Sequence, residues 1–263
     1  MKKILTLAAA FTLFATSQAF ALAGAGAHYI LNTGSLSSNT GILKYENNGE
    51  LYSVTIAQKK NTDLFQGLGF KGWIDFLPLI DIEGTFNIVG ARYGTDLILA
   101  TPTSKTTMPM TFTPDAPYNM IFDKASPMFG MFNADISVTV PMTSLFMIRP
   151  YAGVGGTFFG SVPIVDTELL GKVLSDPQLV AALTGTEGGD AAKEVGQRLS
   201  KALKEESYTA GMGGHIIFGF RIKYPWIFAP PTLYCNGKYY FGGNLPKQFT
   251  NGFVLEAGLG LAL

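Results

Sequence analysis

Residues 128–140 read Met-Phe-Gly-Met-Phe-Asn-Ala-Asp-Ile-Ser-Val-Thr-Val, and polar and apolar side chains alternate along their second part. The polar set is Asn133, Asp135, Ser137 and Thr139, and the apolar set is Phe132, Ala134, Ile136 and Val138. A period of two is what the pleat of a β-strand requires, because successive side chains point to opposite faces of the sheet. The stretch therefore predicts a strand with one polar and one apolar face.

The same alternation recurs along the whole chain in segments of about ten residues, the length of a strand that crosses a membrane. Eight strands are predicted: Ala23–Asn32, Gly67–Phe76, Asp81–Tyr93, Met128–Val140, Phe146–Gly160, Tyr208–Ile222, Leu233–Gly242 and Phe253–Leu263. The polar face of most of them consists of Gly, Ser and Thr with one or two charges, whereas the apolar face carries bulky Phe, Ile, Leu and Val.

Composition narrows the class of protein. Charged residues make up 14% of the 263 residues and hydrophobic residues 47%, whereas soluble domains carry about 25% charged residues. The formal net charge is zero and there is no basic run, so nucleic acid is not an expected partner. The single cysteine, Cys235, excludes a disulfide framework and a cysteine-rich zinc site.

The first residues have the order of a secretory signal peptide. Lys2 and Lys3 precede the apolar run Ile4–Ala15, and Ala19-Phe20-Ala21 is a small-x-small cleavage signal. We therefore expect residues 1–21 to be a signal peptide for Sec-type export and residues 22–263 to form the mature domain. Gly, Pro or a charge interrupts each later apolar stretch, so no transmembrane helix is expected there.

Alternation alone does not say which face of the strands is outside. A soluble barrel or sandwich would turn its apolar face inward, but a face of Gly, Ser and Thr is a poor water-soluble exterior and suits a crowded barrel interior. Bulky apolar side chains are what contact with lipid requires. In lipid all backbone groups must be paired, and a closed barrel achieves this without helices.

The connections between the predicted strands alternate in length. The short ones are 77–80, 141–145 and 223–232, and the others are 33–66, 94–127, 161–207 and 243–252. This is the pattern of outer-membrane barrels, with short periplasmic turns and longer extracellular loops. The sequence thus predicts an all-β fold: an eight-stranded antiparallel transmembrane β-barrel with long extracellular loops.

Segments such as Gly67–Trp73 (Gly-Leu-Gly-Phe-Lys-Gly-Trp) and Arg149–Gly155 (Arg-Pro-Tyr-Ala-Gly-Val-Gly) resemble barrel strands of small eight-stranded outer-membrane proteins of the OmpA/OmpW kind. The resemblance covers the mature chain as a pattern. It implies a bacterial outer-membrane location, contact with outer-membrane lipid and insertion by the barrel-assembly machinery. One departure concerns the insertion signal: such proteins commonly end in an aromatic residue, and this chain ends in Leu263.

Charges on the inward face are the candidate site residues. They are Lys71, Asp75, Asp81, Glu83, Asp135, Arg149, Arg221, Lys238 and Glu256, together with the histidines His28 and His215. Eight strands leave an interior that side chains fill, so we expect these charges to form an internal salt-bridge network; an ion pathway and a catalytic role are the alternatives. A symmetric last hairpin places Lys238 directly opposite Glu256 and predicts a salt bridge. The acidic group at Asp75, Asp81 and Glu83 needs Arg149 or Arg221.

No catalytic, cofactor or metal site is expected. Two histidines on different strands, without ligand spacing, are weak evidence for a metal, and Ile216 and Ile217 follow His215, so no His-x-Ser pattern of a lipid-modifying barrel enzyme is present. Cys235 falls on the outward face. Aromatic girdles are predicted at the strand ends: Phe76, Tyr224, Trp226 and Phe228 on the periplasmic side, and Tyr93, Phe158, Phe159, Tyr208, Tyr240, Phe241 and Phe253 on the external side.

The external loops carry further elements. In the first, Ile42–Tyr45 and Leu51–Ala57 flank Asn47-Asn48-Gly49, which is typical of a hairpin. Thr101–Pro117 of the second loop is either mobile or an extension of the strands. In the third, Asp166–Leu174, Pro177–Leu183 and Asp190–Leu203 have helical spacing, and Val195, Leu199 and Leu203 share one face. These two or three short helices lie above the barrel mouth and either cap the barrel, bind a partner or pack on neighbouring loops.

The expected function is therefore a non-enzymatic integral outer-membrane protein with a structural or surface-interaction role and a filled interior. The alternative is a narrow channel or binding barrel for small hydrophobic molecules, as in OmpW-like proteins. A lipid-modifying outer-membrane enzyme is a third reading. Partners then include outer-membrane lipid and either an extracellular partner or a small hydrophobic ligand.

Overall fold

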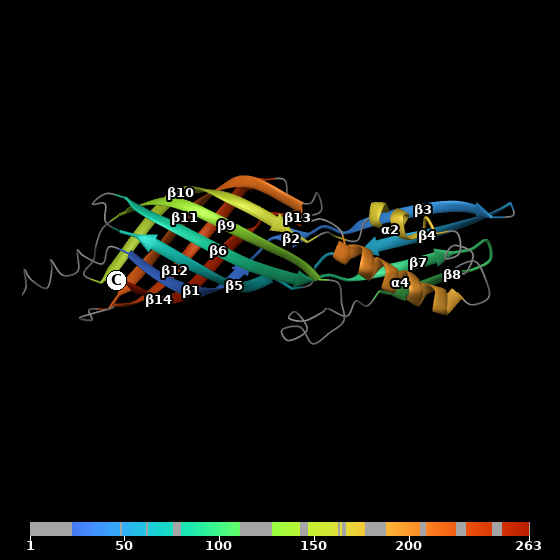
Figure 1. Cartoon of the computed structure of the whole chain (residues 1–263), viewed down its shortest axis with the longest axis horizontal. Helices are drawn as coiled ribbons and strands as arrows, with labels where there is room; N and C mark the ends of the chain where they lie inside the picture. Colours follow the sequence, from blue (N-terminus) through green and yellow to red (C-terminus); the bar gives the residue numbers. More distant parts are fainter. Residues whose placement is uncertain are drawn as a thin grey trace, which may run out of the picture.

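Eight strands of the chain close into a single antiparallel barrel in the computed structural model (Figure 1). The strands are β1 (Ala23–Asn32), β5 (Phe65–Ile74), β6 (Asp81–Arg92), β9 (Met128–Pro141), β10 (Ile148–Ser161), β11 (Thr209–Lys223), β12 (Pro231–Gly242) and β14 (Phe253–Ala262). The structure describes residues 23–47, 49–61, 63–75, 80–110, 128–142, 147–162, 164, 167–176, 188–205, 209–224, 230–243 and 249–262. The predicted signal peptide lies outside these residues.

The barrel strands follow one another around the ring as the sequence predicts. Their order is β1-β14-β12-β11-β10-β9-β6-β5, so each pairs with its neighbour along the barrel chain and the β1–β14 pair closes the ring. The eight predicted segments are confirmed with end shifts of a few residues; β5, for example, begins at Phe65 and ends at Ile74, and β12 begins at Pro231.

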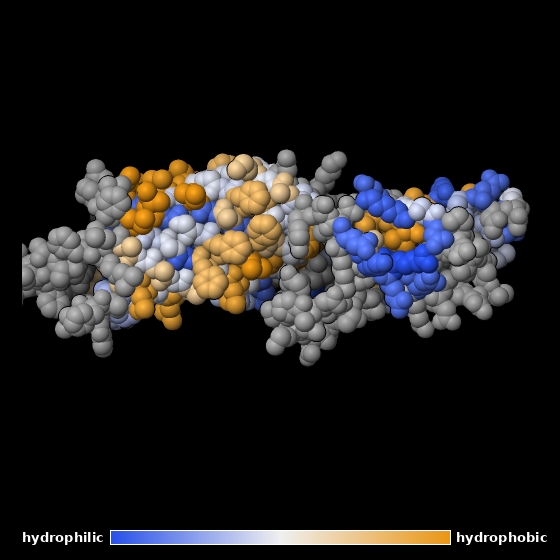
Figure 2. All heavy atoms as spheres, viewed as in Figure 1, coloured by the Kyte–Doolittle hydropathy of each residue, from blue (hydrophilic) through white to orange (hydrophobic). Residues whose placement is uncertain are grey.

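The outside of the barrel is apolar and its inside polar. Leu68, Phe70, Ile136 and Met212 are 65%, 68%, 69% and 79% exposed, and Figure 2 shows apolar side chains over the outer surface of the barrel. Asp81, Glu83, Asp135 and Glu256 are buried on the inner face. This is the arrangement of a membrane-spanning barrel, because lipid covers the apolar exterior.

A second unit, here called the head, extends from one end of the barrel (Figure 1). It is a four-stranded antiparallel sheet in the order β3-β4-β7-β8. Its strands are β3 (Asn39–Asn47), β4 (Glu50–Gln58), β7 (Thr95–Ala100) and β8 (Lys105–Pro109), and its helices are α2 (Thr167–Val173) and α4 (Gly188–Glu205). The helices cover one face of the sheet over a common apolar core that includes Val54, Ile56, Leu97, Leu169 and Leu199.

The loop predictions are largely confirmed. β3 and β4 form the predicted hairpin, with Gly49 at a φ of 79° in the turn. Of the two alternatives for the second loop, extension of the strands is confirmed as far as residue 110, because β7 and β8 add two strands to the sheet. The first and third predicted helices form and pack on neighbouring loops, with Val195 and Leu199 buried. Pro177–Leu183 and the side chain of Leu203 lie outside the described part.

The head continues the barrel wall. β3, β4 and β7 lie side by side in the same order as β1, β5 and β6, the barrel strands that precede or follow them in the chain. The Lys59 backbone N–H donates to the Gly94 carbonyl at 2.8 Å, and the Lys59 ammonium lies 2.8 Å from Asp96. At the barrel mouth, short strands β2 (Ser35–Leu36) and β13 (Phe249–Thr250) pair with each other. The β5–β6 ladder ends at the Gln66–Gly90 pair and the β4–β7 ladder begins at the Gln58–Thr95 pair, and the Lys59 contacts lie between these two ladders.

Neither α2 nor α4, the helices among the described residues, is long and apolar enough to span a membrane.

The core of the head depends on α4. Replacing Leu199, which is fully buried, by Ala should lower the free energy of unfolding of the head by about 2–5 kcal/mol, because a cavity replaces packed methyl groups. Urea-dependent proteolysis of the full chain in lipid measures this. Gln197→Ala, on the exposed side of the same helix, is the control, with an expected change within about 0.5 kcal/mol. Equal losses in both variants would contradict the packing described above.

Candidate functional site: the charged interior of the barrel

Ten charged side chains lie inside the barrel, and their charges balance. The cations are Lys71, Arg149, Arg221, Lys223 and Lys238, and the anions are Asp75, Asp81, Glu83, Asp135 and Glu256. The structure thus brings together all nine predicted charges and adds Lys223, which the sequence analysis assigned to a turn. The inward position of Lys223 follows from strand parity, because Lys223 lies two residues after the inward Arg221 and points to the same face of the strand.

Arg221 is the centre of the group at the short-turn end of the barrel. Its guanidinium contacts Asp75 at 2.6 Å and Asp81 at 3.5 Å, and it is also paired with Glu83. The rings of Trp73 and Tyr151 lie on it, with centroids 5.3 and 4.8 Å from Cζ. This fully buried cation is therefore held by three carboxylates and two aromatic faces.

Two further cations complete this group. Arg149 lies 2.8 Å from Asp81 and 3.5 Å from Asp75, and Lys223 lies 2.7 Å from Asp75. The prediction that the acidic group near the first turn needs Arg149 or Arg221 is confirmed, and both are used.

Lys238 is the centre of the second group, in the middle of the barrel. Its ammonium lies 2.8 Å from Glu256 and 2.8 Å from Asp135. The predicted Lys238–Glu256 salt bridge is therefore confirmed.

The predicted register behind that salt bridge is wrong. Glu256 lies opposite Asn236, and Lys238 lies opposite Val254, so the pair is diagonal. The β12–β14 ladder is centred on position 246, whereas a direct Lys238–Glu256 pairing requires a centre at position 247. The long lysine side chain spans the offset.

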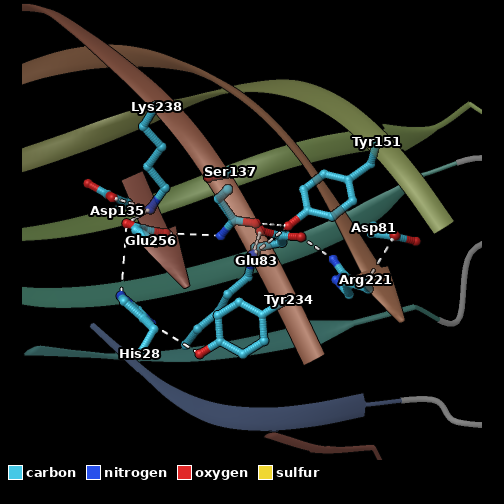
Figure 3. Close-up of polar contacts among 12 residues, drawn as sticks. His28, Asp81, Glu83, Asp135, Ser137, Tyr151, Arg221, Tyr234, Lys238 and Glu256 are labelled. Carbon is cyan, nitrogen blue, oxygen red and sulfur yellow. Dashed lines mark hydrogen bonds and ion pairs between the residues drawn. The ribbon is translucent and has the colours of Figure 1, made fainter. Parts of the chain in front are cut away.

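A chain of contacts joins the two groups (Figure 3). Lys71 is paired with Glu83 and donates a hydrogen bond to the Tyr151 hydroxyl at 2.9 Å. Tyr151 donates to the amide oxygen of Asn236, whose Nδ2 donates to Glu256 at 3.0 Å. The network therefore runs without a break from Lys223 to Lys238.

Both histidines belong to this polar interior. The amide oxygen of Asn87 only accepts, so His28 Nε2 donates to it, at 2.8 Å, while Nδ1 accepts from the Tyr234 hydroxyl at 3.0 Å. His215 contacts the hydroxyls of Ser137 and Thr157 at 2.8 and 2.7 Å. Both histidines lie on the inward face, as strand parity predicts, but parity does not identify these partners on other strands.

Glycines make room for the histidine rings. Gly155 lies opposite both His215 and Ser137 on its two neighbouring strands, and a Cβ there would lie 2.4 Å from His215 Cε1. Gly69 stands in the same relation to His28 and Asn87, with a Cβ 2.4 Å from His28 Nε2. Each ring therefore crosses over a glycine to reach the strand beyond. The glycine-rich inward face follows from this requirement.

The Ser137–His215 contact has the residue types of a nucleophile and its base. However, Nδ1 of His215 contacts Thr157 rather than a carboxylate, and both side chains of the pair are fully buried. Asp135 is engaged by Lys238 and Tyr240. Among the described residues, no group of three or more His, Cys, Asp or Glu side chains could hold a metal ion.

No family model matches the chain, and no curated protein matches it. Among solved structures, it is similar to the outer membrane protein OprG from Pseudomonas aeruginosa, with a TM-score of 0.35 and 10% identity over 90% of this chain and 95% of that one. It is also similar to Ail, the attachment invasion locus protein of Yersinia pestis, with a TM-score of 0.35 and 7% identity over 91% of this chain and 96% of that one. The closed ladder and its apolar exterior establish a small eight-stranded transmembrane β-barrel.

An apolar cluster fills the head end of the lumen. Phe65, Phe129 and Phe249 pack on one another with ring centroids 5.4–5.8 Å apart, and Leu36 and Ile30 are fully buried beside them. Leu36 and Phe249 come from the short strands β2 and β13. The cluster thus covers the charged interior at this end.

Part of the predicted aromatic girdle is wrong. Tyr93, Phe159 and Tyr240 are buried with the apolar cluster, because their parity along the strands turns them inward. Phe158, Phe241 and Tyr224 are exposed as predicted, at 40%, 50% and 57%. Phe253 is partly buried against Phe218. Four members of the predicted girdle lie outside the described residues: Phe76, Tyr208, Trp226 and Phe228.

Removing Arg221 should leave its carboxylates without their central cation. We expect Arg221→Met to lower the free energy of unfolding in lipid vesicles by about 3–5 kcal/mol, because buried charges are then uncompensated. Arg198→Met in α4, where the side chain is 42% exposed, is the control and should cost about 1 kcal/mol or less. Urea titration of both variants measures the difference, and a loss at position 221 no larger than at 198 would contradict the network.

Two adjacent glycines test the space beneath His215. Gly155→Ala should destabilise the barrel by about 1–3 kcal/mol, because the new methyl group overlaps the ring. Gly156→Ala points outward, where no atom lies within 4 Å, and should be within about 0.5 kcal/mol of wild type. Heat-dependent gel mobility of both variants reports this order. The reverse order would rule out the inward assignment of residue 155.

Proposed function

We propose that this chain is an integral protein of the bacterial outer membrane, non-enzymatic, whose barrel does not conduct ions and whose head serves a structural or surface-interaction role. The single observation that carries the proposal is the filled interior: ten mutually paired charges lie below an apolar cluster. Export by the leader at residues 1–21, insertion by the barrel-assembly machinery and contact with outer-membrane lipid are parts of the same proposal.

The interior opposes conduction for an electrostatic reason. An eight-stranded barrel is just wide enough for side chains to fill. A passing ion would have to give up its water and separate pairs such as Arg221–Asp75 and Lys238–Glu256, whose members are almost fully buried. The mostly hydrophobic cluster around Phe129 adds a second layer, which solvates an ion poorly.

The head supports the surface-interaction role. It has an apolar core of its own, and its sheet continues the barrel wall through the β5–β6 and β4–β7 ladders. Strand pairing and a packed apolar core hold the head together as one unit beyond the end of the barrel. The long connections lie at this end, which is the extracellular end in outer-membrane barrels.

The apolar cluster also favours a second candidate, a binding barrel for small hydrophobic molecules. Its aromatic side chains, among them Phe65 and Phe129, lie at the end of the lumen that faces the head. A hydrophobic ligand would have to displace Leu36 and Phe249, which pack against the cluster from β2 and β13. Uptake of a fluorescent hydrophobic probe by vesicles that contain the protein tests this candidate.

Conductance across a planar lipid bilayer is the test of the main proposal. The full-length mature chain should give no steady current, whereas an open porin inserted in the same membrane gives stepwise conductance. Steady ion current from the wild-type chain would contradict the proposal. Trypsin cleavage in α4 on intact cells, where Arg198 and Lys201 are partly or fully exposed, should confirm that the head is extracellular.

A further inference from the structure

β3 is an open edge of the head sheet. In the barrel, β1 pairs with β5 on one side and with β14 on the other. In the head, β3 follows β1 in the chain and pairs with β4, which precedes β5, but no described strand of the head sheet takes the place of β14. β14 begins at Phe253, and in the described residues of the connection before it the strand is β13, which pairs with β2. In the described part of the chain, β3 therefore pairs with β4 alone.

The two edges of this sheet differ. β8 is five residues long, begins with Lys105 and ends with Pro109, features that discourage pairing with another chain. β3 is nine residues long, contains no proline and exposes Ile42 at 52%. Figure 1 shows β3 along the side of the head, parallel to the long axis of the molecule. A strand could be added at β3 without displacing any described strand.

We propose that the β3 edge pairs antiparallel with β3 of a second copy of this chain anchored in an opposing membrane, with Tyr45 at the two-fold axis. The inference rests on the proposed extracellular display of the head. Because the strand runs along the long axis, antiparallel pairing points the two barrels in opposite directions. The product is a contact between two membranes.

Charge selects this register. With Tyr45 opposite Tyr45 of the second copy, Lys44 of each copy faces Glu46 of the other on the outer face of the sheet. A shift of the axis to residue 44 or 46 would instead set lysine against lysine or glutamate against glutamate, which is unfavourable between directly opposed residues. Both side chains are exposed, and no ion pair among the described residues engages either of them.

An aromatic ladder on the other face favours the same register. Tyr45 and Tyr52 lie opposite each other on β3 and β4, and their rings stack with centroids 5.5 Å apart and planes 9° apart. The second copy would extend this stack to four rings. Burial raises the pKa of Tyr45, and the hydrogen bond that Tyr52 donates to Glu50 raises the pKa of Tyr52, so both phenols are neutral at physiological pH.

Two copies in one membrane do not satisfy these conditions. Their two-fold axis lies along the membrane normal, parallel to β3, so the strands would run parallel. A rotation about that axis also reverses the faces of the sheet, so Lys44 of one copy and Glu46 of the other would point to opposite faces and could not pair. The charge pattern thus favours contact between opposing membranes over pairing within one.

Lipid nanodiscs that each hold one copy of the full mature chain provide the test, with sedimentation velocity as the measurement. Wild-type discs should pair. Lys44→Glu and Glu46→Lys should each weaken self-pairing about tenfold, because both symmetry-related ion pairs become like-charge pairs. An equimolar mixture of the two variants should pair as wild type does, since the acidic positions of one then face the basic positions of the other.

Three outcomes would overturn the proposal: wild-type discs that stay single, single variants that pair as well as wild type, or a mixture that stays single although wild type pairs. Lys105→Glu on the opposite edge is the matched control and should pair like wild type. Heat-dependent gel mobility and a near-UV circular dichroism spectrum like that of the wild type establish that each variant is folded. Failure of pairing leaves the conductance and cell-surface cleavage results unchanged, so it is distinguishable from failure of the proposed function.

Discussion

Pairing among the interior charges is the constraint on which this structure depends. A narrow barrel surrounded by lipid has little water to solvate an isolated charge, so each cation needs a carboxylate within contact distance. Arg221 meets this need with Asp75, Asp81 and Glu83, and Lys238 meets it with Asp135 and Glu256. Because these residues come from five strands and from the position directly after β5, the pairs also hold the strands in register. The same ion pairs therefore hold the barrel closed and fill its lumen.

Volume is the second constraint, and glycine satisfies it. Rings large enough to cross the lumen, such as His28, His215 and Trp73, lie over glycines on neighbouring strands. This leaves the bulky apolar residues for the outer face, where lipid contacts them. Beyond the lipid the same strands no longer need a closed ring, and β3, β4 and β7 continue as an open sheet that helices cover on one face. The same order of strands thus forms a filled membrane-spanning barrel and a head built on an open sheet.

Strand parity accounts for what could be predicted. Alternation in segments such as residues 128–140 identified the eight strands and the inward charges, because parity is a local property of the backbone. Three errors show its limits. Parity does not fix which residues of β12 and β14 face each other, and Lys238 pairs diagonally with Glu256 because the register is shifted by two residues from the predicted one. The head sheet depends on contacts between separate loops. Tyr240 lies near the end of its strand, which predicts a place in the girdle, but it points inward because it has the same parity as Lys238.

The most direct test of the account is solid-state NMR of the full chain in lipid, through nitrogen–carbon transfer from lysine Nζ to side-chain carboxyl carbons. The account predicts cross-peaks from Lys238 to both Asp135 and Glu256, and from Lys71 to Glu83, with lysine protons that exchange slowly with water. Rapid exchange at Lys71 and Lys238 without those cross-peaks would mean a hydrated lumen with unpaired charges, and would contradict the account.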